Sequence, residues 1–300
     1  MIHHITAICS NAGRSARFYT KVLDLRLVKL TINQDDMGTY HIYFGDRTGR
    51  VGSVLTFFQW SEMPKGKVGV GMVSKVAFKI PLGSMKFWEK HLKKNGVKIK
   101  KEERFGRNVL SIEDPDGLNL ELIEEGGAGN WAKNVNEESS ISGFYGATLL
   151  VRDYEDTANL LTRFLRYVHI KSEDNMHRYF SDETIIDIEE DSKMENGEYG
   201  LGSVHHIAFR TENEETQMDL RESLKKAGFN LTHSIDRFYF KSVYFREKGG
   251  ILFEIATDGP GFIVDEKEED LGTKLVLPPK FELQRKEIEK LLPGFDFGKV

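Results

Sequence analysis

The stretch SVHHIAFRT at residues 203–211 and the stretch SKVAFKI at residues 74–80 share one pattern of apolar and polar residues. An amphipathic helix follows each of them, MDLRESLKKAG at 218–228 and KFWEKHLKKNG at 86–96. Both helices end with a Lys-rich turn and a glycine, which is a common form of helix C-terminus. The chain therefore repeats a unit that begins with a strand and a helix, and this repeat decides the fold.

Each unit closes with a turn and a strand, DPDGLNLELIEE in one copy and EKGGILFEIATD in the other. The alignment of the two copies places Lys75 on His206 and Glu121 on Glu254. Two further copies follow the same order: one runs from His4 through a helix at 16–25 to a strand at 51–60, and the other runs from Gly146 through a helix at 157–167 to a strand at 184–191. The sequence thus predicts four modules, each made of a strand, a helix and further strands.

Residues 126–142, GGAGNWAKNVNEESSIS, are polar and glycine-rich, as linkers between folded units often are. We therefore expect two halves with these bounds: an N-terminal pair of modules at 1–128, a linker at 129–142, a C-terminal pair of modules at 143–262 and a C-terminal tail at 263–300. The tail carries the acidic run DEKEED, which is most simply a solvated surface or the start of a helix.

The composition is that of an ordinary globular protein, since 39% of the 300 residues are hydrophobic and 30% are charged. The net charge of -5 argues against a nucleic-acid-binding surface. No run of about 18 apolar residues would cross a membrane, and a strand already begins at Ile2, which leaves no room for a secretory signal. We expect a cytoplasmic protein. Its single cysteine, Cys9, excludes an internal disulfide and has the strand context of a buried apolar residue.

Two His-His pairs, His3-His4 and His205-His206, open predicted strands far apart in the sequence. Side chains alternate across a strand, so only one histidine of each pair faces a given side. His205 shares its side with the apolar Ile207, and this side should pack on a helix. His206 therefore points to the other side, and the same alternation makes His4 its equivalent.

Glu254 lies in the middle of the apolar strand ILFEIA and shares the side of His206. An ionised carboxylate there costs several kcal/mol unless a cation, hydrogen-bond donors or a shifted pKa compensates. Two histidines and one carboxylate form the facial triad of non-haem Fe(II) oxygenases. A lone histidine would be an ordinary core residue, but two matched histidines and this glutamate predict a metal site formed by His4, His206 and Glu254.

The other copies offer incomplete ligand sets. The second copy has Glu121 but carries Lys75 at the histidine position, which predicts an ion pair in place of a metal and hence a structural cleft. The remaining copies have these residues at the equivalent positions: Gly146 with Asp187 or Glu189 in the third, and Thr56 and Phe58 in the first. Because only the first and fourth copies together supply the full set, the site should lie between the two halves of the chain.

The four modules resemble the vicinal oxygen chelate superfamily, which includes glyoxalase I, antibiotic-resistance binding proteins and extradiol dioxygenases. The resemblance covers nearly the whole chain. The segments most similar to ring-cleaving hydroquinone dioxygenases and their uncharacterised bacterial relatives are MIHHITAIC, YHIYFGD, GSVLTFF, VHHIAF, DRFYFKSVYFR, GGILFEIATDGPGF and DEKEEDLGTKLVLPP. The resemblance implies an α+β fold of four tandem βαβββ modules in two halves, with open-barrel mixed sheets and helices outside.

In the ring-cleaving hydroquinone dioxygenases the second histidine of each pair and the glutamate of the FE motif bind Fe(II). The resemblance therefore implies His4, His206 and Glu254 as ligands, and Mn(II) suits the same ligands. The catalytic positions that the resemblance implies are Tyr244, Arg237, His205, Thr6 and His3. Strict alternation places His3 and His205 on the helix-packed side, where a structural role fits better than contact with a substrate.

The implied activity is ring cleavage of a dihydroxylated aromatic substrate, such as a hydroquinone or a catechol, with O2. Tyr244, or a histidine beside the metal ligands, would take or orient a substrate proton, and Arg237 would stabilise the anionic charge that develops on the substrate. Tyr244 and Arg237 are equally consistent with an ordinary pair of residues on the surface of a strand, without a catalytic role. A glyoxalase-like lyase or isomerase is an alternative, although that chemistry often uses two carboxylates, and a small-molecule-binding resistance protein is another. Exposed sheet edges favour a homo-oligomer.

Overall fold

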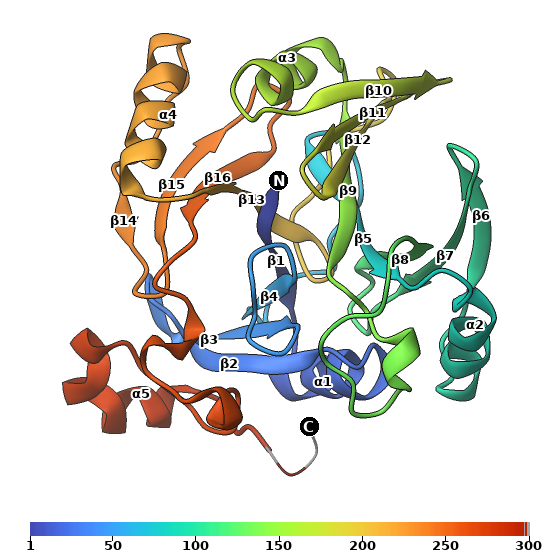
Figure 1. The fold of residues 1–300 in the computed structure, drawn as a ribbon. Coiled ribbons are helices and arrows are strands. Elements are labelled where there is room, and N and C mark those ends of the chain that lie inside the picture. The colour runs from blue at the N-terminus through green and yellow to red at the C-terminus, as the bar shows by residue number, and fades with distance from the viewer. Residues whose placement is uncertain (297, 299–300) are drawn as a thin grey trace.

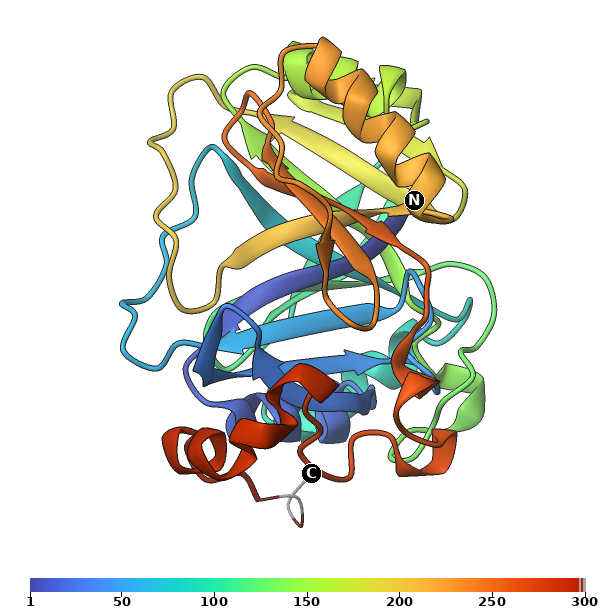
Figure 2. The same cartoon turned by 90° about the vertical axis from the view of Figure 1, so that its left-hand side faces the viewer.

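The strands of the repeat form two curled, mixed sheets in the structure, a computed structural model that describes residues 1–296 and 298. Each sheet has eight strands, and the helices lie on the outside of the sheets (Figure 1). This arrangement confirms the α+β fold of open-barrel mixed sheets. Figure 2 shows the same two sheets from the side, with the C-terminal segment packed below the first of them.

The first sheet consists of the first and fourth modules. Its spatial order is β14 (Ile235–Asp236), β15 (Lys241–Arg246), β16 (Leu252–Thr257), β13 (Val204–Thr211), β1 (Ile2–Cys9), β4 (Val54–Gln59), β3 (Asp36–Gly45) and β2 (Arg26–Asn33). The first strands of the two modules, β1 and β13, pair antiparallel at its centre. A site on this sheet therefore combines residues from both ends of the sequence, as the distribution of candidate ligands predicts.

The second sheet consists of the second and third modules. Its order is β10 (Val168–Glu173), β11 (Met176–Ser181), β12 (Thr184–Glu190), β9 (Phe144–Val151), β5 (Met72–Ile80), β8 (Asn119–Glu124), β7 (Arg107–Glu113) and β6 (Lys100–Arg104). Here β5 and β9 pair antiparallel at the centre. Each sheet thus joins one module from the N-terminal part of the chain to one from the C-terminal part.

Alternation along the strands separates a packed outer side from a concave inner side. Ile207 and Phe253, which share the outer side of β13 and β16, are completely buried. They belong to the core over which α4 (Glu214–Lys226) packs. This helix begins four residues earlier than the stretch 218–228 predicts, because Asn213 and Thr216 form a capping box at its N-terminus. Cys9 is a free, buried thiol in the same core, as expected.

The remaining helices are short. They are α1 (Ala12–Arg17), which continues into a π-helical turn at Phe18–Val22, α2 (Met85–Lys94), α3 (Glu155–Arg163) and α5 (Arg285–Leu291), with 3-10 turns at Glu137–Ser139, Phe262–Val264, Glu268–Asp270 and Pro279–Gln284. Trp88 of α2 is completely buried, and its indole N–H donates to the carbonyl of Ser139 over 3.0 Å. None of the helices within the described residues is long and apolar enough to cross a membrane.

Two β-bulges interrupt the pairing of β1 with β13. The register shifts between Ile2 and His4, so His3 has no directly opposed residue, and a second shift leaves His205 without one on the partner strand. A bulge breaks the alternation of the strand and re-aims the side chain of the extra residue. Strict alternation therefore does not apply to the first histidine of either pair.

The concave side of the second sheet holds a cluster of four charged residues, of which Glu121, Arg178 and Asp187 are buried and Arg104 has a side chain 12% exposed. The two terminal nitrogens of Arg104 lie 2.8 and 2.5 Å from the carboxylate oxygens of Glu121, and its Nε lies 3.1 Å from Asp187. Arg178 donates to both oxygens of Asp187 over 2.7 and 2.8 Å. Two guanidinium groups and two carboxylates thus form a neutral cluster, in which the planar forks match the carboxylates.

The predicted pairing of Lys75 with Glu121 is wrong. The Nζ of Lys75 lies 3.7 Å from Glu189, and both side chains are about 30% exposed. Glu121 is 1% exposed and forms its ion pair with Arg104, which lies on β6, two strands away from β8 in the sheet. An ion pair does occupy this cleft, but its cations come from β6 and β11 rather than from the position that corresponds to His206.

The acidic run in the tail is not simply a solvated surface. Lys29 on β2 is completely buried and donates to Asp265 over 2.7 Å, to Glu266 and to the carbonyl of Phe262. A fully buried ammonium needs such partners, and the first two residues of DEKEED supply them. Asp265 also accepts a hydrogen bond from the hydroxyl of Tyr239 over 3.0 Å, so the tail also holds the segment 236–240 in place.

Candidate metal centre

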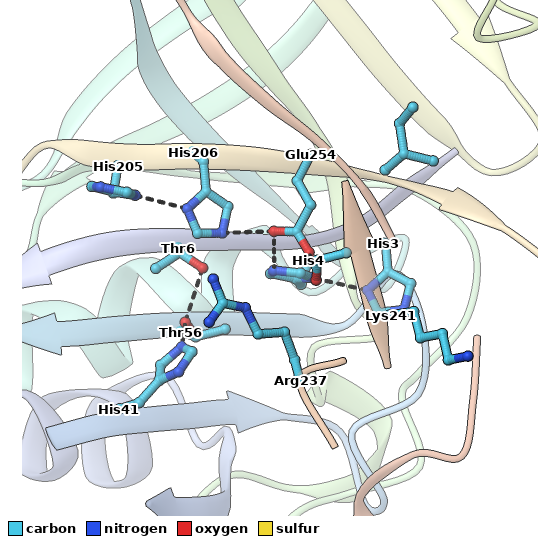
Figure 3. Close-up of polar contacts among 12 residues, drawn as sticks. His3, His4, Thr6, His41, Thr56, His205, His206, Arg237, Lys241 and Glu254 are labelled. Atoms are coloured by element: carbon cyan, nitrogen blue, oxygen red, sulfur yellow. Dashed lines mark hydrogen bonds and ion pairs between the residues drawn. The ribbon is translucent and has the colours of Figure 1, made fainter. Parts of the chain in front are cut away.

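Three ligand residues meet on the concave side of the first sheet (Figure 3). His4 on β1, His206 on β13 and Glu254 on β16 come from three adjacent strands. The Nε2 atoms of His4 and His206 lie 3.3 and 3.0 Å from Oε2 of Glu254. The three ligand atoms lie within 4.8 Å of one another, and all three residues are buried. The structure thus brings together the three residues that alternation selected.

His3 determines which nitrogen of His4 carries a proton. The Nε2–H of His3 donates to the carbonyl oxygen of Thr257 over 3.0 Å, because a carbonyl can only accept. Burial lowers the pKa of His3 to about 3, so its ring is neutral and its Nδ1 is an acceptor. The Nδ1 of His4, 2.8 Å away, therefore donates to it. With the proton of His4 on Nδ1, its Nε2, which faces Glu254, is the nitrogen left to bind a metal.

The carboxylate of Glu254 has one satisfied oxygen and one unsatisfied oxygen. Its Oε1 accepts a hydrogen bond from the hydroxyl of Ser242 over 2.5 Å, whereas Oε2 is buried without a hydrogen-bond partner. Burial alone would raise the pKa of Glu254, but His4 and His206 outweigh burial and hold its pKa well below the usual range. A buried anionic oxygen beside two imidazole nitrogens is a donor set that binds a divalent cation. The residues therefore fit a divalent metal such as Fe(II) or Mn(II).

His205 stands beside His206 as His3 stands beside His4. The two Nδ1 atoms lie 2.8 Å apart, and burial lowers the pKa of His205 to about 3. Its ring packs at 5.5 Å between centroids against Phe58. The expectation that His3 and His205 face the helix-packed side is wrong, because the two bulges turn their rings toward the ligand histidines. Outer hydrogen bonds of this kind fix the tautomer of a metal-binding histidine.

A chain of hydrogen bonds lines the other part of the concave side. The hydroxyl of Tyr43 lies 2.8 Å from Nδ1 of His41, whose Nε2 lies 2.7 Å from the hydroxyl of Thr56. The hydroxyls of Thr56 and Thr6 lie 3.1 Å apart. Among these four residues, only Thr6 was predicted from the sequence to occupy a catalytic position. Alternation along YHIYFGD does place His41 and Tyr43 on one side, but only the register of β3 with β4 shows that Thr56 shares it.

Arg237 and Tyr244 lie at the rim of the same concave side. The ring of Tyr244 is 5.6 Å from that of His206, and the guanidinium of Arg237 lies 5.5 Å from the Tyr244 ring. Both terminal nitrogens of Arg237 donate to the carboxylate of Asp35, over 3.0 and 2.8 Å. Neither Ser242 nor Asp35 was predicted from the sequence. Alternation from Tyr244 would have indicated Ser242, whereas Asp35 lies at a turn without a periodic pattern.

These side chains enclose a cavity of about 30 Å³. Its lining consists of His4, Asn33, Gln34, Asp35, His41, Tyr43, Phe58, His206, Arg237, Phe240 and Tyr244. This volume is far below that of a cavity that holds benzene, about 150 Å³. An aromatic molecule therefore requires the cavity to widen.

A family model for the Glyoxalase/Bleomycin resistance protein/Dioxygenase superfamily matches residues 1–122 and 124–255. The chain belongs to this superfamily. The two matched segments contain His4, His206 and Glu254, and together they cover almost all of both sheets. The resemblance that the sequence motifs carry is thereby confirmed at the level of the superfamily.

Several relatives within the superfamily match over nearly their whole length. The protein named "Putative ring-cleaving dioxygenase MhqO" from Bacillus subtilis (strain 168) is 44% identical in an alignment that covers 98% of this chain and 96% of the relative. The chlorohydroquinone/hydroquinone 1,2-dioxygenase of Sphingobium indicum is 31% identical in an alignment that covers 96% of this chain and 94% of the relative.

Solved structures confirm the fold of this superfamily member. The crystal structure titled "putative dioxygenase from Bacillus subtilis subsp. subtilis str. 168" matches with a TM-score of 0.95 at 42% identity, over 99% of this chain and 97% of that chain. Glyoxalase I from Zea mays matches with a TM-score of 0.64 at 14% identity, over 86% of this chain and 92% of that chain. At this low identity, the second match shows the fold alone.

Proposed function

We propose that this protein is an Fe(II)-dependent ring-cleaving dioxygenase that acts on a hydroquinone-like substrate with O2. The observation that carries the proposal is the buried set of His4, His206 and Glu254, in which Oε2 of Glu254 has no hydrogen-bond partner and lies 3.3 and 3.0 Å from the Nε2 atoms of the two histidines. The relatives named as ring-cleaving and hydroquinone dioxygenases support the reaction and the substrate class.

The single carboxylate of the ligand set favours oxygen chemistry over glyoxalase-like isomerisation. Among the described residues, the group that meets at this site contains Glu254 and no second acidic ligand. When bound there, Fe(II) supplies the redox chemistry through which an aromatic diol and O2 react. The protein holds the metal on one side with His4, His206 and Glu254, and two of these residues also line the cavity that a substrate would fill.

The rim residues would bind and orient the ring. Burial raises the pKa of Tyr244, so its hydroxyl stays protonated at neutral pH and donates a hydrogen bond to a phenolate oxygen. It therefore orients a substrate rather than removing its proton. Arg237 keeps its charge, as arginine does in proteins, and stabilises anionic charge on the ring while Asp35 fixes its position.

The rim must open to admit a ring, and its contacts suit that motion. Asp35, with a side chain 69% exposed, joins Arg237 across the rim, and the side chain of Gln34 donates to the carbonyl of Arg237 over 2.7 Å. An ion pair with one partner this exposed contributes only about 0.2–1 kcal/mol. Separation of the segments 33–35 and 236–240 would therefore cost little and would widen the cavity.

Anaerobic loading with Fe(II), followed by oxygen-electrode measurements on a panel of hydroquinones and catechols, tests the proposed function. We expect oxygen uptake with formation of a ring-opened acid, and no uptake by the metal-free protein. Stoichiometric metal binding without oxygen uptake on any diol would contradict the dioxygenase and favour an isomerase. Loading with Mn(II) in parallel determines which metal supports the reaction.

Replacing His205 with phenylalanine should weaken metal binding by about 10–100-fold, the usual effect of losing an outer partner of a metal-binding histidine. Phenylalanine keeps the packing against Phe58 but removes the group that bonds to Nδ1 of His206. Competition with a chromogenic chelator measures the affinity. The matched control is His169→Phe on the exposed strand β10, which should leave the affinity unchanged.

A further inference from the structure

Next to the proposed metal centre, the concave side of the first sheet carries a chain of hydrogen-bonded polar residues that has no role in holding the metal. It consists of Tyr43, His41, Thr56 and Thr6. Thr6 and Thr56 are completely buried, and Tyr43 is 4% exposed. Burial of polar groups is costly unless they form hydrogen bonds, and apolar side chains would fill this space without that cost. The two members nearest the rim, His41 and Tyr43, line the same cavity as His4 and His206.

The internal repeat relates this polar chain to the metal side of the cavity. Tyr43 opposes Thr56 in the register of β3 with β4, as Tyr244 opposes Glu254 in the register of β15 with β16. The registers therefore give three pairs of equivalent residues: Tyr43 and Tyr244, Thr56 and Glu254, and His41 and Ser242. The hydrogen bond between Ser242 and Glu254 has its counterpart between His41 and Thr56. The cavity thus has two related sides, and a threonine replaces the carboxylate on the side without a metal.

His41 allows the hydrogen bonds of the polar chain to run in either of two directions. Burial holds the pKa of His41 well below its usual range, so the ring is neutral, with one donor and one acceptor nitrogen. Either Tyr43 donates to His41 and the chain runs on to Thr56 and Thr6, or all these bonds are reversed. In the reversed direction Nδ1–H of His41 donates to Tyr43, and the O–H of Tyr43 is free to donate to a ligand. In the first direction Tyr43 donates to His41, and its oxygen is free to accept a hydrogen bond from a ligand. His41 therefore lets one hydroxyl serve as donor or acceptor.

The polar chain leads from Thr6, which opposes His206 in the register of β1 with β13, across β4 to His41 and Tyr43 on β3. His4 is on β1 and His41 on β3, two strands away, which corresponds to about 10 Å between the strands. A ring held by one hydroxyl at the metal side presents a para hydroxyl to the opposite side. An ortho hydroxyl stays close to the metal side instead. The two kinds of diol thus differ in whether they reach Tyr43 and His41.

We propose that Tyr43 and His41 form a binding site for the second hydroxyl of a 1,4-dihydroxy aromatic ring, with His41 as the positioning residue and Thr56 and Thr6 as its support. This inference rests on the proposed function and adds the feature that selects 1,4-diols over 1,2-diols. Tyr43 contacts the substrate, and His41 acts through it, because its neutral ring accepts from the Tyr43 hydroxyl in one direction of the chain and donates to it in the other.

Anaerobic calorimetry with the Fe(II)-loaded protein tests the proposal without any turnover. The probes are hydroquinone, catechol and 4-methylphenol, which keeps the shape of hydroquinone but lacks the second hydroxyl. We expect hydroquinone to bind about tenfold more tightly than 4-methylphenol, the usual effect of one hydrogen bond to a buried partner. In Tyr43→Phe and in His41→Phe this ratio should fall toward one, whereas His41→Gln, which keeps a donor and an acceptor, should restore part of it.

The matched control is Phe240→Leu, which alters an apolar residue of the same cavity wall whose ring packs on His4 rather than on His41. It should change the affinities for hydroquinone and 4-methylphenol by the same factor, so that their ratio stays at its wild-type value. Tyr43→Phe removes a single oxygen and keeps the test valid if His41→Phe does not fold. Hydroquinone binding with an unchanged ratio in Tyr43→Phe overturns this inference and leaves the proposed function standing. Failure of the wild-type protein to bind hydroquinone or catechol overturns both.

Discussion

Replacement of Glu254 with alanine is expected to abolish metal retention and to lower ring-cleaving activity by more than about a hundredfold. Loss of even an outer partner of a metal ligand costs about 10–100-fold in affinity or activity, and Glu254 is one of three direct ligands in the proposed centre. The variant should fold, because alanine removes a buried anion and leaves two imidazoles that can both be neutral. Circular dichroism and size-exclusion chromatography check the fold before the metal content per chain is measured.

Glu121→Gln is the matched control for this experiment. Glu121 occupies the position of the repeat that corresponds to Glu254, but it lies on β8 of the second sheet and pairs with Arg104. Glutamine keeps an acceptor for that arginine, so the folded variant should retain its full metal content and its oxygen uptake. Stoichiometric metal in Glu254→Ala, or loss of metal in Glu121→Gln, would show that the ligand set lies elsewhere.

The ligand set itself was accessible from the sequence because two independent patterns agree on it. Alternation along β13 and β16 separates His206 and Glu254 from apolar neighbours such as Ile207, and the repeat aligns the two outer modules. Neither pattern requires knowledge of which strands are neighbours. A buried carboxylate in an apolar strand is also costly enough to indicate a compensating group, whatever the rest of the fold.

The residues that alternation misplaced depend on pairing between distant strands. His3 and His205 face the ligand histidines because each lies in a bulge, and a bulge exists only relative to a partner strand that is about 200 positions away in this chain. Arg104 and Asp35 were missed for the same reason. Arg104 contacts Glu121 from β6, across the sheet. Asp35 contacts Arg237 from a turn in a different module. Sequence periodicity carries no information on such contacts.

Replacement of Glu121 with alanine is the second change with a large expected effect, and here the effect is on stability. Removing one partner of a buried ion pair typically lowers the free energy of unfolding by about 3–5 kcal/mol, because the remaining charge is left uncompensated. Arg104, with a side chain 12% exposed, would lose the carboxylate that accepts two of its hydrogen bonds. Urea denaturation, followed by tryptophan fluorescence at a fixed metal concentration, measures the loss.

The double variant Glu121→Leu with Arg104→Met separates charge from packing in this cluster. Arg178 and Asp187 still neutralise each other in it, so no uncompensated charge remains, and most of the lost stability should return. A double variant as unstable as Glu121→Ala would show instead that the cluster acts through its shape. The two sheets then differ in one physical respect. The second sheet carries its own cations, whereas the centre proposed on the first sheet takes its cation from a metal, so a chelator is expected to destabilise the metal-loaded wild-type protein and to have no such effect on Glu254→Ala.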